Sequence, residues 1–133
     1  MAKIQGLDSL NRRFREMIPE AKDAFRKSLQ QGAEEIVASM RALAPVDDGA
    51  LKASIRWTAD TTGKDSKGDE GLRYYIIAGG RGVNYAAYVE FGTQDTPANP
   101  FFFPAYRLMR KRVRARVGRT VGKAIRDSFK RGS

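Results

Sequence analysis

Neither cysteine nor histidine occurs among the 133 residues of the sequence. These two absences exclude a thiolate nucleophile, a disulfide framework, a zinc finger, a Ser-His-Asp triad and an imidazole acid–base catalyst. Catalysis is therefore the minority interpretation, and we expect no cofactor.

Long apolar segments are also missing. No run approaches the roughly 18 consecutive apolar residues of a membrane-spanning helix, and residues 1–5 lead into a polar helical pattern rather than the apolar core of a signal peptide. We therefore expect a soluble protein that is not exported. With 41% hydrophobic residues, a chain of this length can form one core, so we predict a single domain over residues 1–133.

Acidic residues are scarce at the C-terminal end. Residues 106–133 contain eleven Lys and Arg but only Asp127 as an acid, whereas residues 1–105 contain fourteen charges of each sign. The whole net charge of +10 therefore lies in the last 28 residues. Such a segment is a candidate contact for a polyanion or an acidic partner. The alternative is the solvated face of a helix.

Apolar residues follow helical spacing over the first third of the chain. Proline lacks an N–H and restricts the residue before it, so Pro19 divides this pattern into a helix at residues 8–17 and a longer helix at residues 19–43. We place residues 1–18 as an N-terminal helical extension. The Ala44-Pro45 pair ends the longer helix.

The middle of the chain alternates between apolar and polar residues. This alternation predicts a strand at residues 51–59, with Trp57 pointing inward, and a second strand at residues 72–78. Residues 60–71 lack apolar side chains, so we predict a flexible hairpin loop there. Residues 85–91 fit either a strand or one face of a helix, and we take them as a strand.

A long basic helix is predicted at residues 104–129, because Pro104 suits a first helical turn. Its apolar stripe consists of Leu108, Met109, Val113, Val117, Val121, Ala124, Ile125 and Phe129. A helix of about 39 Å spans the whole body of so small a chain, so its stripe needs a partner. The candidates are the face at residues 36–40 of the long N-terminal helix and a neighbouring subunit. The expected fold class is α+β, a small antiparallel sheet packed with a long N-terminal helix and a long basic C-terminal helix.

Three segments carry a more specific pattern. Residues 44–55 read Ala-Pro-Val-Asp-Asp-Gly-Ala-Leu-Lys-Ala-Ser-Ile, residues 85–93 read Tyr-Ala-Ala-Tyr-Val-Glu-Phe-Gly-Thr, and residues 97–105 read Pro-Ala-Asn-Pro-Phe-Phe-Phe-Pro-Ala. With the helices around them, over about residues 20–125, they resemble the tail-component family of lambdoid long-tailed bacteriophages, which covers neck, tail-completion and head–tail connector proteins. The family pattern reads roughly Ala-Pro-x-Asp-Thr-Gly-x-Leu-x-x-Ser-Ile, then Tyr-Ala-x-Tyr-Val-Glu-Phe-Gly-Thr, then Pro-x-x-Pro-Phe-x-x-Pro-Ala.

The sequence departs from that pattern in three places. Asp48 stands where the family usually has Thr, Phe103 stands where a polar or basic residue is commoner, and the Arg-rich segment after Arg107 is not attributable to the family. The resemblance implies a non-enzymatic structural virion protein at the head–tail junction, in the neck or in tail completion. It also implies a homo-oligomeric ring, other connector or tail proteins as partners, and assembly in the host cytoplasm. The alternative is a basic protein that binds nucleic acid without sequence preference.

Candidate contact residues fall into two groups. For a subunit interface we predict the crowded aromatic residues Tyr85, Tyr88, Phe91, Phe101, Phe102 and Phe103. The alternatives for residues 101–103 are core packing and, together with Tyr106, a stacking platform for single-stranded bases. For contact with a polyanion or an acidic partner we predict Arg110, Lys111, Arg114, Arg116, Arg119, Lys123 and Arg126.

Other possible sites have ordinary explanations. Asp47 and Asp48 fit a solvated turn better than a cation site, and Glu90 fits a hydrogen bond or salt bridge better than a catalytic acid. A metal-dependent hydrolase or nuclease that uses these three acids is the least favoured function. Residues 79–82 form a turn rather than a phosphate-binding loop. The apolar side of the basic helix has no Trp and one Leu, so we do not expect membrane binding.

Overall fold

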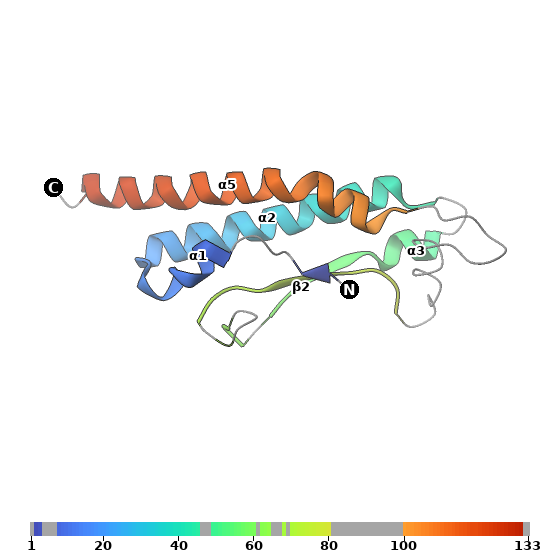
Figure 1. The fold of residues 1–133 in the computed structure, drawn as a ribbon, viewed down its shortest axis with the longest axis horizontal. Coiled ribbons are helices and arrows are strands. Elements are labelled where there is room, and N and C mark those ends of the chain that lie inside the picture. Colours follow the sequence, from blue (N-terminus) through green and yellow to red (C-terminus); the bar gives the residue numbers. More distant parts are fainter. Residues whose placement is uncertain are drawn as a thin grey trace.

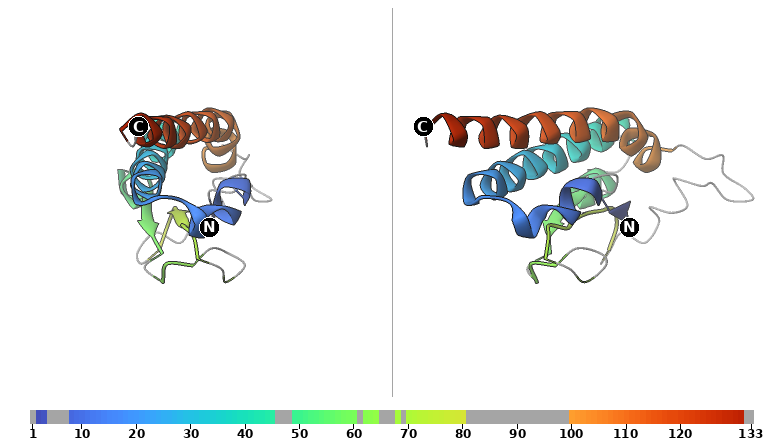
Figure 2. Two further views of the ribbon diagram at one scale, coloured as in Figure 1. Left: turned by 90° about the vertical axis from the view of Figure 1, so that its left-hand side faces the viewer. Right: turned by 60° about the vertical axis from the view of Figure 1, so that its left-hand side comes forward.

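The computed structural model describes residues 2–3, 8–45, 49–60, 62–64, 68, 70–80 and 100–131. In chain order its elements are β1 (Ala2–Lys3), α1 (Asp8–Arg12), the short 3-10 helix η1 (Phe14–Glu16), α2 (Pro19–Leu43), α3 (Gly49–Ser54), β2 (Arg56–Ala59), β3 (Tyr74–Ile77) and α5 (Phe102–Arg131). Helix α5 lies on α2, and α2 lies on the sheet, so the chain forms three layers (Figures 1 and 2). The predicted α+β class is confirmed.

Helix α2 is the middle layer, and its bounds match those predicted from the two prolines. Pro19 occupies the first helical position, where its missing N–H costs no helical hydrogen bond. Ala44 caps the other end in an extended conformation, as expected for a residue before a proline. Because α5 covers one side of α2 and the sheet the other, α2 carries a broad buried surface that includes Phe25, Leu29, Ile36 and Met40.

Helices α2 and α5 run antiparallel and approach closely at a glycine. A Cβ atom built on Gly32 would lie 2.4 Å from Cγ1 of Val113, which leaves no space for even a methyl group. Val113, Val117 and Val121 are at most 3% exposed along this contact. The long N-terminal helix is therefore the partner of the apolar stripe, as the sequence analysis proposed first.

Among the described residues, the sheet has three antiparallel strands in the order β1-β3-β2. Trp57 of β2 pairs with Ile76 of β3, and its ring stacks on Tyr74 with a centroid distance of 5.5 Å. Trp57 is half-buried against the core, whereas Tyr74 and Ile76 are fully buried under α2. Strand β1 was not predicted, because its two residues are too few to show a period.

The predicted strand at residues 51–59 is wrong in its first half, because residues 49–54 form helix α3. Leu51 and Ile55 are buried, and they face the same way at either strand spacing or helical i, i+4 spacing. Ala53 distinguishes the two, since it would be buried in the strand but is exposed in the helix. The Ser54 hydroxyl also donates a hydrogen bond to the Leu51 carbonyl at 2.6 Å and helps to close the turn.

The N-terminal residues that the structure describes pack on the rest of the chain. The predicted helix at residues 8–17 is divided into α1 and η1. Phe14 is 4% exposed and contacts Phe25 edge-on, with a centroid distance of 6.0 Å. The Asn11 side chain donates to the Leu72 carbonyl and accepts from the Leu72 N–H, both at 3.0 Å. These bonds tie α1 to the start of β3.

The hairpin between β2 and β3 begins with an ion pair. Arg73 binds Asp60, and its Nε donates to Oδ2 at 2.9 Å. Hydrogen bonds from the Thr62 hydroxyl and N–H, together with the Arg73 guanidinium, lower the pKa of the Asp60 carboxyl well below its usual range. The flexibility of residues 60–71 stays a prediction, and the predicted turn at 79–84 and strand at 85–91 lie mostly or wholly outside the described residues.

The close approach at Gly32 gives a first testable prediction. Gly32→Ala should destabilise the fold by about 1–3 kcal/mol, because the new methyl group overlaps the stiff, buried Val113. Gly118→Ala in α5 is the matched control, since nothing lies within 4 Å of its built Cβ. That control should be neutral or stabilising by up to about 1 kcal/mol, through helix propensity alone. Urea unfolding measures both changes, and a Gly32→Ala variant as stable as the wild type would contradict the packing.

Candidate partner-binding face of helix α5

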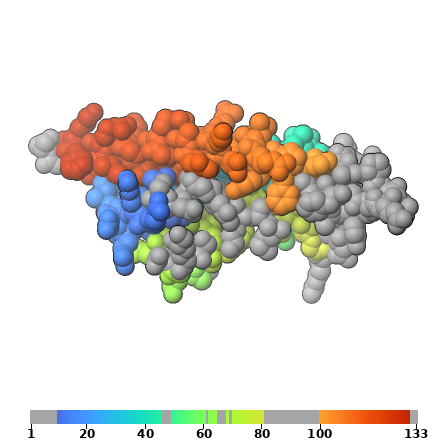
Figure 3. All heavy atoms as spheres, viewed as in Figure 1, coloured from blue at the N-terminus to red at the C-terminus, as the bar shows by residue number. Residues whose placement is uncertain are grey.

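Helix α5 forms one long edge of the molecule (Figure 3). It begins two residues before the predicted helix and ends two residues after it, with Pro104 in its first turn. That turn needs no donor from Pro104, because the first four N–H groups of a helix have no partner within it. At 1.5 Å per residue its 30 residues extend about 45 Å.

Two members of the predicted apolar stripe face outward instead. Leu108 is 72% exposed and Phe129 is 76% exposed. At about 100° per residue, Leu108 lies about 180° around the helix from the buried Val117, and Phe129 lies about 120° from it. Both residues fit the predicted stripe because they are apolar and near the correct spacing, but the angular drift along the helix places them away from the buried side.

One of the predicted cations has a structural role. Arg116 reaches across to α2, where its guanidinium donates to Oε1 of Glu35 at 2.6 Å. The exposed fractions of the two side chains are 22% and 31%, so the pair is partly shielded from water. The other oxygen of Glu35 is buried and accepts no hydrogen bond in the described residues. Arg116 is therefore committed to holding α5 on α2.

The other six predicted cations are exposed on α5. They are Arg110, Lys111, Arg114, Arg119, Lys123 and Arg126. Lys123 contacts Asp127 one turn further along, at 3.4 Å, which is an exposed pair of small energetic value. The remaining five form no ion pair in the part of the chain that the structure describes.

A regular row of arginines on α5 was not predicted from the sequence. Arg112, Arg119 and Arg126 recur every seventh residue, and all three are exposed. Seven-residue spacing keeps side chains near one line on a helix, with a drift of about 20° per repeat. Arg112 was left out of the predicted contact, although the repeat is visible in the sequence once the buried side of the helix is known.

The predicted aromatic interface divides into two parts. Phe101 and Phe102 are 1% and 5% exposed and belong to the core, as the core-packing alternative expects, whereas Phe103 is half-buried. Little of Phe101 or Phe102 is left to contact another subunit. Tyr85, Tyr88 and Phe91 lie outside the described residues, so their interface role stays a prediction.

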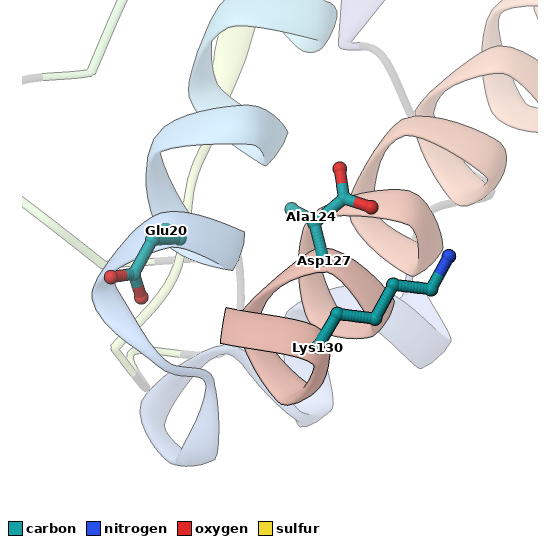
Figure 4. A pocket seen from close by; sticks show the side chains of 4 residues that line it. All are labelled: Glu20, Ala124, Asp127 and Lys130. Atoms are coloured by element: carbon teal, nitrogen blue, oxygen red, sulfur yellow. The ribbon is translucent and has the colours of Figure 1, made fainter. Parts of the chain in front are cut away.

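Shallow hollows flank the end of α5. One, of about 520 Å³, lies between the first turn of α2 and α5 and is lined by Glu20, Ala124, Asp127 and Lys130 (Figure 4). Another, of about 340 Å³, lies between η1 and α5. The described residues include no group of three or more acids, His or Cys that could hold a metal ion.

Burial raises the pKa of the Tyr74 hydroxyl, which packs within the core.

A comparison with protein families gives one match. The family model described as "Bacteriophage HK97-gp10, putative tail-component" matches residues 8–92, which is more than half of the chain. The chain belongs to this HK97 gp10-like family. The resemblance to phage tail components is therefore confirmed, and the chain is assigned to the structural proteins of the virion. No curated protein and no solved structure matches the chain.

The HK97 gp10-like match covers α1, α2, α3 and the β2–β3 hairpin, and it ends before α5. Asp47, Asp48 and Glu90 fall within the matched range but outside the described residues. The basic face of α5 thus lies outside the matched range. No helix among the described residues combines the length and apolarity needed to cross a membrane.

The ion pair between the helices gives a second prediction. Arg116→Ala should destabilise the fold by about 1–2 kcal/mol, because it leaves the partly shielded Glu35 carboxylate without its donor. Arg119→Ala is the matched control, since Arg119 is exposed one turn away. It should change stability by less than about 0.5 kcal/mol. If the two variants are equally stable in chemical unfolding, the structural role assigned to Arg116 is contradicted.

Proposed function

We propose that this chain is a non-enzymatic subunit of the phage head–tail junction, acting in the neck or in tail completion as a member of a homo-oligomeric ring. Membership of a phage tail-component family is the observation that carries this proposal. The subunit would be assembled in the host cytoplasm and would dock on other connector or tail proteins. Its function is to provide a fixed geometry between neighbouring parts of the particle.

The chemistry of the described residues supports a structural role over a catalytic one. The chain has no His or Cys. Among the described residues, two groups have shifted pKa values and both shifts have structural explanations, since Asp60 closes a hairpin with Arg73 and Tyr74 is buried under α2. Neither faces a second group of the kind that acid–base catalysis requires.

Ring formation needs a heterologous contact that repeats and closes. We assign this contact to the segment at residues 85–103, with Tyr85, Tyr88, Phe91 and the half-buried Phe103 as its aromatic members. Aromatic residues are enriched where subunits meet. Phe101 and Phe102, near the end of this segment, belong to the core.

The ring proposal predicts a defined closed multimer that persists in high salt. Native mass spectrometry and sedimentation measure it directly. Tyr88→Asp should reduce the multimer to folded monomers, because a carboxylate would be buried at the contact. Leu43→Asp is the matched control and should leave the multimer intact, since Leu43 is exposed at the end of α2. A wild-type chain that stays monomeric at all concentrations would contradict the proposal of a ring. A Tyr88→Asp variant that assembles normally would show that the interface lies elsewhere.

Non-specific DNA binding is the second candidate function, and the exposed cations of α5 favour it. Five of the predicted cations are exposed without an ion pair in the described residues. If they grip phosphates, affinity for duplex DNA persists at physiological salt and falls with a slope of several counterions. Our proposal of a structural subunit instead predicts that binding to duplex DNA is lost at physiological salt. Fluorescence anisotropy with a 20-base-pair duplex from low to physiological salt distinguishes the two.

A further inference from the structure

Helix α5 exposes two large apolar side chains with small residues between them. Leu108 lies on the outer face, and Phe129 lies at the edge of the hollow between η1 and α5, which it helps to line. Leu108 and Phe129, both more than two-thirds exposed, are 21 residues apart, which is three seven-residue repeats. The residues between them at the same spacing are Ala115 and Gly122. The four positions drift by about 20° per repeat, so they follow one shallow line around the helix. We call this line, Leu108-Ala115-Gly122-Phe129, the seam.

Arginines border the seam along one side. Arg112, Arg119 and Arg126 lie four residues after successive seam positions, which places each of them next to the seam. All three are exposed, and none forms an ion pair in the described part of the chain. The seam therefore presents an apolar anchor at each end, small residues between them, and a positive border.

We propose that the seam binds an acidic α-helix of a neighbouring phage protein, with glutamate or aspartate side chains at seven-residue spacing opposite Arg112, Arg119 and Arg126. The anchors are separated by about 32 Å, so the partner helix needs about three repeats. Small residues in the middle of the seam let the two helix axes approach closely. The partner's identity as a phage protein rests on the proposed function, but the seam and its charge do not.

Charge excludes a second copy of α5 as the occupant. Two α5 helices packed seam to seam would bring their arginine rows together in an antiparallel pair, and a parallel pair would still bring together two strongly basic helices, so like charges repel in either orientation. Duplex DNA would satisfy the arginines, but it would leave Leu108 and Phe129 facing a phosphate backbone. An acidic helix satisfies both the arginines and the anchors, because its apolar side covers the seam while its carboxylates meet the guanidinium groups.

A synthetic four-repeat helical peptide, with Leu on its apolar side and Glu on the flanks, is the probe. Its control carries Lys in place of Glu. Titration calorimetry should show binding of the Glu peptide only. Leu108→Asp and Phe129→Asp should each weaken it at least tenfold. The triple variant Arg112→Glu, Arg119→Glu, Arg126→Glu should no longer bind the Glu peptide and should bind the Lys peptide instead. Lys52→Glu, an exposed charge reversal on α3, should leave binding unchanged.

Circular dichroism checks that each variant folds, as expected for substitutions at exposed positions. The inference is overturned if the wild type does not bind the Glu peptide, if Leu108→Asp binds it within twofold of the wild type, or if duplex DNA displaces it at physiological salt. The multimer mass is measured on the same samples. If the wild type forms rings but does not bind the Glu peptide, only this inference is overturned. If the wild type is monomeric but binds the Glu peptide, only the proposal of a ring is overturned.

Discussion

The contact between Gly32 of α2 and Val113 of α5 determines which side of α5 reaches solvent. Only a glycine allows the approach, because a built Cβ atom would lie 2.4 Å from the valine. The close packing aligns Val117 and Val121 with α2 and brings Arg116 within hydrogen-bonding distance of Glu35. Since side chains on a helix have fixed angular positions, fixing one side of α5 also fixes the other. The exposure of Leu108 and of the arginine row follows from this single contact.

This arrangement gives α5 two sides with different surroundings. The inner side stabilises the chain through valines and one cross-helix ion pair. The outer side has little to contribute to the stability of the isolated subunit, because its cations are solvated and its two large apolar residues are exposed. A subunit that must dock on neighbours is expected to have such a side. The HK97 gp10-like match ends before α5, so the match itself says nothing about this surface.

Much of the helical architecture could be predicted from the sequence, because proline positions and helical spacing are local signals. Pro19 and Pro45 define α2 to the residue. Residues 51–54 were predicted wrongly, because Leu51 and Ile55 satisfy both a strand and a helix, and only the packing of Ala53 distinguishes them. The outward positions of Leu108 and Phe129 depend on which turn of α5 meets Gly32. That pairing joins distant parts of the chain, and no local pattern specifies it.

The central claim is that the inner side of α5 is held on α2 and that a partner covers the outer side in the particle. The absence of cysteine makes this claim directly measurable. An introduced thiol is unique in this chain. Ala115→Cys places it on the seam, and Val117→Cys places it on the inner side, where the native residue is fully buried. In the free subunit, the thiol at position 115 should react rapidly with a maleimide, and the thiol at position 117 should not. In purified phage particles, both should be protected. A thiol at position 115 that reacts as fast in the particle as in the free subunit would contradict the account.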